Sequence, residues 1–127
     1  MKTSELTGAA LDWAVAKCEG YTDLHKIEGR MPHEPQLGMF PPRKEYGVME
    51  LWELSFSSDW NKGGWIIERE KINVSLSATA PWMAWLYDGL EMIELMDGET
   101  PLQAAMRCYV ASVLGDEVEL PDEVTNV

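Results

Sequence analysis

The sequence has few basic residues, and its second half has almost none. The 127 residues include 10 Lys and Arg against 22 Asp and Glu, which gives a formal net charge of −12. The only base after Lys71 is Arg107. A protein that binds a phosphate backbone needs clustered Lys and Arg, because these side chains displace the counterions of the nucleic acid. We therefore expect no direct binding of nucleic acid.

Cysteine and histidine are also scarce. Cys18 and Cys108 are too few for a disulfide framework, and no basic-then-apolar leader follows Met1. His25 and His33 lie eight residues apart, which is no recognised spacing of metal ligands. Apolar residues at 46% and charged residues at 25% are ordinary globular values rather than those of a membrane protein. We expect an intracellular protein that contacts no membrane and holds no metal or cofactor.

Residue arrangements typical of catalysis are missing as well. No serine occupies a nucleophile elbow, and there is neither a glycine-rich phosphate loop nor a P-loop lysine. Glu68 and Glu70 flank Arg69 and would point to different faces of a helix, so a surface ion pair is favoured over an acid–base pair. A nucleotide hydrolase would have to rely on His33, with no second ligand at a suitable spacing. We expect a protein that is not an enzyme.

Helix signals occur at three places along the chain. Thr7 is expected to cap a helix over 8–19, with Leu6 and Leu11 at the spacing of a hydrophobic staple. The run Thr100-Pro101-Leu102-Gln103 has the form of a capping box and opens a helix that Gly115 closes. A third helix is expected from Ser57-Ser58-Asp59 to Arg69, although two glycines weaken its start.

Strand signals lie between the last two of these helices. Apolar and polar residues alternate over 72–79, and this period of two predicts a half-buried strand. A second strand over 82–87 leads into Asp88-Gly89, a hairpin signal, so a third strand over 91–96 should run back beside it. The pattern over 48–54 does not decide between a strand and a helical turn.

Residues 20–47 show neither the helical nor the strand period of apolar residues. They hold four of the seven prolines and four of the ten glycines, and are expected to form a Pro-stiffened surface excursion. The expected order is helix, excursion, helix, three strands, helix. This order predicts an α+β fold, in which a small three-stranded antiparallel sheet packs with about three helices in a single domain over 1–127. An acidic tail follows over 116–127.

The six tryptophans are more than a chain of this length easily buries. Trp82 and Trp85 have opposite parity on one strand, so they should point to opposite faces of the sheet. One face would then present aromatic surface beside Met83 and Met92, unless the excursion folds back over it. Exposed aromatic surface marks contact with another protein, with a second copy of the chain, or with a stacked base.

Three stretches of the sequence together span most of the chain: LTGAALDWAVA at 6–16, SSDW with GG and IIERE within 57–70, and TPLQAAMRCYVA at 100–111. In this order they resemble the NinX-like family of phage proteins of unknown function. The resemblance implies a phage origin, expression inside a bacterium and a small α/β sandwich. It carries no established reaction or ligand. The chain departs from the family pattern at Trp65, where proline is more usual, and over 21–56, which is longer than the common form.

The leading hypothesis is a non-catalytic phage accessory protein in the host bacterial cytoplasm that binds a host macromolecule, most simply a protein, and inhibits an antiphage defence system. The acids of the tail either meet a basic partner or form a solvated segment. The expected partner-binding residues are Trp82, Trp85, Tyr87, Glu117, Glu119, Asp122 and Glu123.

The alternative hypothesis is a sponge that sequesters a nucleotide immune signal. A helix N-terminus presents free backbone donors to an anion, and arginine can meet phosphate. The shortage of bases counts against this alternative. The expected ligand-binding residues are Ser58, Asp59, Trp60, Arg69 and Arg107.

Overall fold

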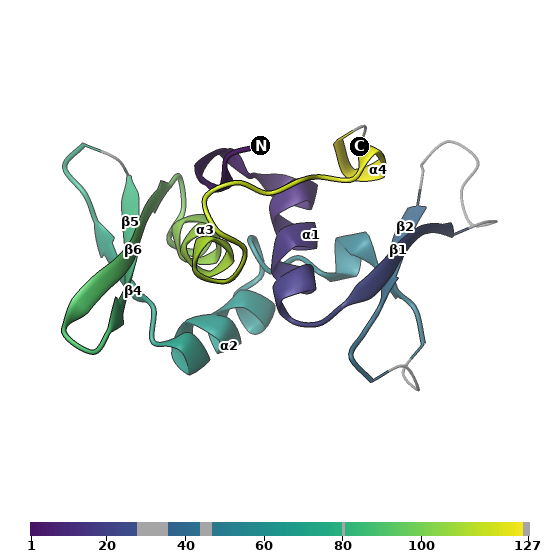
Figure 1. The fold of residues 1–127 in the computed structure, drawn as a ribbon, viewed down its shortest axis with the longest axis horizontal. Coiled ribbons are helices and arrows are strands. Elements are labelled where there is room, and N and C mark those ends of the chain that lie inside the picture. Colours follow the sequence, from purple (N-terminus) through teal and green to yellow (C-terminus); the bar gives the residue numbers. More distant parts are fainter. Residues whose placement is uncertain (28–35, 44–46, 80, 126–127) are drawn as a thin grey trace.

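The computed structural model describes residues 1–27, 36–43, 47–79 and 81–125 (Figure 1). Short 3₁₀ turns lie at Thr3–Glu5 and Leu51–Glu53. The helices and strands, in chain order, are α1 (Gly8–Cys18), β1 (Thr22–Ile27), β2 (Gln36–Phe40), β3 (Met49–Glu50), α2 (Trp60–Glu70), β4 (Asn73–Leu76), β5 (Trp82–Asp88), β6 (Glu91–Gly98), α3 (Pro101–Leu114) and α4 (Asp122–Thr125).

The predicted α+β fold with its antiparallel sheet and three helices is confirmed. Strands β4, β5 and β6 form a sheet in that order, and Trp85 is paired with Asn73 on one side and Leu95 on the other. Gly89 makes the hairpin turn with φ of +64°, a left-handed conformation that glycine adopts without strain. Strand β4 ends at Leu76, earlier than the alternation suggested.

The prediction of an aperiodic excursion over 20–47 is wrong for its described part. Strands β1 and β2 lie within it and form a second antiparallel sheet with β3. The alternation of β1 is broken by a bulge between Thr22 and His25, where Asp23 has φ of +59°. Strand β2 is short and contains Gly38, so its pattern is weak too. His33 and the rest of 28–35 lie outside the described residues.

Helix α3 is the centre of the fold. Figure 1 shows it between the β4–β5–β6 sheet and α1, while the β1–β2–β3 sheet lies at the other end of the molecule. Half of its capping box is confirmed, because Thr100 Oγ1 accepts from the Gln103 amide at 3.0 Å. Gln103 Oε1 accepts at 2.8 Å from the amide of Glu99, one residue before the N-cap, and not from the amide of Thr100 itself. Leu6 and Leu11, the expected staple, are fully buried against this core. Thr7 occupies the N-cap of α1, but its side chain makes no capping hydrogen bond, so that part of the prediction is wrong.

The acidic tail is anchored at several points. Val118 exchanges two backbone hydrogen bonds with Met1, at 2.9 and 3.0 Å, and Val118 and Val124 are buried. The carboxylates of this segment remain exposed. The tail is therefore packed through its valines while its charges face solvent. No described helix is long and apolar enough to cross a membrane.

Candidate functional site

The two faces of the β4–β5–β6 sheet differ in what covers them. Ala84 and Leu86 on β5 are buried on the face that α3 covers, and Trp82 packs against the same core. Trp85 has the opposite parity and points to the other face, as predicted. Figure 1 shows no helix or strand against that other face, so the excursion does not fold back over it in its described part.

This uncovered side is called the outer face, and its apolar part consists of Met83, Trp85, Tyr87, Met92 and Leu95. The first three come from β5, and the register places Met92 opposite Tyr87 and Leu95 opposite Trp85. Tyr87, Met92 and Leu95 are between 46% and 51% exposed. A contiguous apolar patch of this kind on a protein surface is typical of an interaction site.

The surroundings of the outer face are acidic. Asp97 pairs with Met83 and therefore lies on the same face, and Asp88 and Glu91 flank the hairpin turn. No Lys or Arg occurs anywhere in 72–98. The outer face is thus an apolar centre with a negative margin.

The structure does not bring all the predicted partner-binding residues together. Trp82 faces the core, while Trp85 and Tyr87 lie on the outer face. The exposed acids Asp122 and Glu123 belong to α4, which lies beside α1 and is separated from β5 by α3 (Figure 1). Asp122 and Glu123 therefore form a region separate from the outer face, whereas Glu117 directly follows Asp116, which lies close to Glu94 of β6.

The N-terminus of α2 is capped by the chain itself. Asp59 Oδ1 accepts from the amide two residues later at 2.9 Å, as the sequence predicted. Just before it, Asp12 Oδ1 accepts from the amide and hydroxyl of Ser57, at 2.9 and 2.7 Å. Burial raises the pKa of the Asp12 carboxyl, although the bonds from Ser57 oppose this shift. Ser58 and Trp60 remain exposed.

The two predicted phosphate-binding arginines lie on different helices and are both engaged. Arg69, at the far end of α2, binds both carboxylate oxygens of Glu19 at 2.8 and 2.5 Å. Arg107 on α3 is buried and donates to the Leu6 carbonyl at 2.8 Å and the Asp97 carbonyl at 3.0 Å. The sponge hypothesis stays a prediction, with its arginines already holding other parts of the chain.

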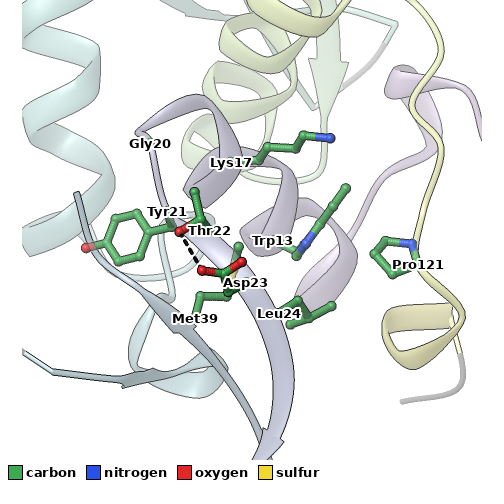
Figure 2. Close-up of a pocket in the computed structure, with 9 residues that line it drawn as sticks. All are labelled: Trp13, Lys17, Gly20, Tyr21, Thr22, Asp23, Leu24, Met39 and Pro121. Atoms are coloured by element: carbon green, nitrogen blue, oxygen red, sulfur yellow. Dashed lines mark hydrogen bonds between the residues drawn. The ribbon is translucent and has the colours of Figure 1, made fainter. Parts of the chain in front are cut away.

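A cleft of about 460 Å³ lies between α1, the start of β1 and Pro121 (Figure 2). The ammonium of Lys17 lies 5.2 Å from the centre of the Trp13 ring, which forms part of the wall. Asp23, with its left-handed backbone, lines the same cleft. One cation and one carboxylate give the lining no net charge, so the cleft has no evident preference for a nucleotide phosphate.

The cysteines are unsuited to nucleophilic chemistry. Burial raises the pKa of both the Cys18 and the Cys108 thiol to about 12, so neither is a thiolate near neutral pH. Among the described residues no three His, Cys, Asp or Glu side chains gather as a metal site would require.

Comparison with known proteins identifies the family. No curated protein matches the chain. The family described as Bacteriophage P22, NinX matches residues 2–113, which include all three stretches that carry the resemblance. The match leaves out Met1 and residues 114–127, which include α4. The protein therefore belongs to the NinX family of bacteriophage proteins.

Proposed function

We propose that the protein is a non-catalytic phage accessory protein that binds a host protein in the cytoplasm of the infected bacterium. The observation that carries this proposal is the outer face, an uncovered sheet surface with Trp85 near its middle. Membership of a phage family supports action inside a host cell. Inhibition of an antiphage defence system is the consequence that we propose for this binding.

The side chains of the outer face are of the kind that dominate binding energy. Trp and Tyr are enriched among the residues whose truncation weakens an interface most, and such residues lie near its centre. Trp85 is half-buried between Met83 and Tyr87 along the strand and faces Leu95 across it. A partner that covers this group would desolvate Trp85 completely, while the half-exposed side chains around it exclude water.

The charge of the surface selects among partners. A second copy of the chain would bring another net charge of −12 against the same acidic margin, which costs energy through repulsion between like charges. A host protein with an apolar patch and a basic margin would instead gain from Asp88, Glu91 and Asp97. We therefore take a basic host protein as the occupant, and expect its binding to weaken at high salt.

Trp85→Thr is expected to weaken capture of the host partner by about thirtyfold or more, because a central tryptophan contributes about 2 kcal/mol or more to such an interface. The measurement is quantitative pull-down from host lysate with the tagged protein, followed by titration of the captured partner. The matched control is Trp65→Ala, which removes an exposed tryptophan of α2 outside the outer face. Equal capture by wild type and the folded Trp85→Thr variant would refute the proposal.

A further inference from the structure

Strand β6 is an open edge of its sheet. The strand order β4-β5-β6 gives β6 a hydrogen-bonded neighbour on one side only. Glu91–Gly98 is also the longest strand described. An edge strand presents unpaired N–H and C=O groups, to which another extended chain can add.

The contacts of Arg107 show which backbone groups face this edge. Arg107 Nη1 donates to the Asp97 carbonyl at 3.0 Å, so this carbonyl points away from β5. In an antiparallel pair the backbone groups of alternate residues point the same way, and the register is regular from Glu94 to Gly98. The amide and carbonyl of Leu95 and the amide of Asp97 therefore face the edge. No described residue forms a backbone hydrogen bond with Leu95 there.

The usual protections of an edge are weak on β6. Proteins block such edges with charged side chains, above all Lys, with Pro, with bulges or with a covering segment. Glu91–Gly98 contains three acids but neither Lys nor Pro, and the bulge opposite Leu86 and Tyr87 lies nearer the hairpin turn. Arg107 occupies one carbonyl at the end of the strand. The segment around Leu95 is left regular and open.

The charges that β6 carries beside this edge are negative, and Arg107 of α3 lies at the end of the strand. Partial burial raises the pKa of the Glu94 carboxyl, and repulsion from the nearby Asp116 carboxylate adds to this shift. Asp97 adds a side chain that is 56% exposed, with its Oδ1 at 4.0 Å from Arg107 Nη1. An added strand with Lys or Arg would relieve this repulsion, whereas a second copy of β6 would double it.

We propose that β6 binds an extended, basic segment of the partner as an additional strand, through the backbone of Leu95 and Asp97. This inference rests on the proposed function and names the form of the partner's contact. Backbone hydrogen bonds to Leu95 supply affinity that depends little on partner sequence. The outer face and the acids beside the edge then supply specificity.

The test is an NMR titration of the isotope-labelled full chain with a capped synthetic peptide of about eight residues in which lysine and valine alternate, a length that spans a strand. We expect saturable shifts along β6 and slower hydrogen exchange at the Leu95 and Asp97 amides. A peptide in which glutamate replaces lysine is the control and should leave both amides unchanged. Three results would overturn the inference. The first is chemical-shift changes confined to other elements, and the second is equal binding of the control peptide. The third is no binding at about 1 mM peptide, a concentration that detects even weak affinities.

A pair of variants separates backbone pairing from side-chain contact. Leu95→Pro removes the outward N–H without removing a bond to β5, and Leu95→Ala removes the same side chain but keeps the N–H. We expect the peptide to bind the proline variant about tenfold more weakly than the alanine variant. Equal affinities would overturn strand addition and leave the Trp85 result to decide the proposed function. If the proline variant does not fold, amide exchange in the wild-type chain decides the inference.

Discussion

Gly63→Ala is expected to lower the free energy of unfolding by about 2–4 kcal/mol, because the added methyl group has no room. A Cβ at this position would lie 2.2 Å from the backbone oxygen of Phe56 and 2.6 Å from Leu102 Cδ1. The oxygen belongs to the backbone and cannot move aside cheaply. The glycine thus allows α2 to approach both the loop before it and α3.

Gly64→Ala is the matched control for this change. Its Cβ would meet only Trp60 Cε3, at an ordinary contact distance of 3.5 Å. Since alanine favours the helix over glycine by about 1 kcal/mol, this variant should be as stable as the wild type or slightly more stable. Urea denaturation, monitored by tryptophan fluorescence, measures the free energy of unfolding of both variants. If Gly63→Ala were as stable as Gly64→Ala, helix propensity rather than close packing would govern the site.

Arg107→Met is expected to cost about 2–3 kcal/mol of stability, because it keeps most of the side-chain volume but leaves the Leu6 carbonyl without its donor. Leu6 is fully buried, and Arg107 Nε donates to its carbonyl at 2.8 Å. Burial lowers the pKa of the guanidinium, but arginine remains charged at any pH at which the protein folds. The side chain therefore acts as a permanent clamp between α3, β6 and the N-terminal segment.

Arg69→Met tests whether any arginine would give this result. Arg69 is about half exposed, and its pair with Glu19 is screened by solvent. Loss of this ion pair should lower the free energy of unfolding by about 1 kcal/mol or less. Chemical denaturation of the two variants, at the same pH and salt, compares them directly. If Arg107→Met unfolded no more easily than the wild type, Arg107 would return to the list of candidate ligand-binding residues.

The parts of the fold that could be predicted from the sequence depend on local interactions. The helix cap at Thr100 needs only residues within one helical turn, and the hairpin turn at Gly89 needs only a left-handed backbone. The opposite directions of Trp82 and Trp85 follow from the pleat of a strand alone. These features are confirmed because no distant contact is required to produce them.

The parts that could not be predicted depend on distant contacts. Strand β1 is interrupted at Asp23, and its partner β2 is so short that only Leu37 and Met39 alternate in it. The position of α3 decides which face of the β4–β5–β6 sheet stays uncovered. The role of Arg107 rests on a carbonyl 101 positions earlier in the chain. No spacing rule in the sequence indicates such a contact, so an arginine suited to phosphate proved to be engaged elsewhere.

The most direct test of the central claim is hydrogen exchange of the full chain, alone and with the captured host protein bound. Exchange reports the protection of each segment in the complex without any substitution. If the partner binds the outer face, amide hydrogen exchange in the complex should be slower across Trp82–Gly98 than in the free protein. Exchange should be unchanged in α4 and in the residues around the cleft at Trp13 and Asp23. Protection of α4 or the cleft with no change in Trp82–Gly98 would contradict the account and place the interface elsewhere.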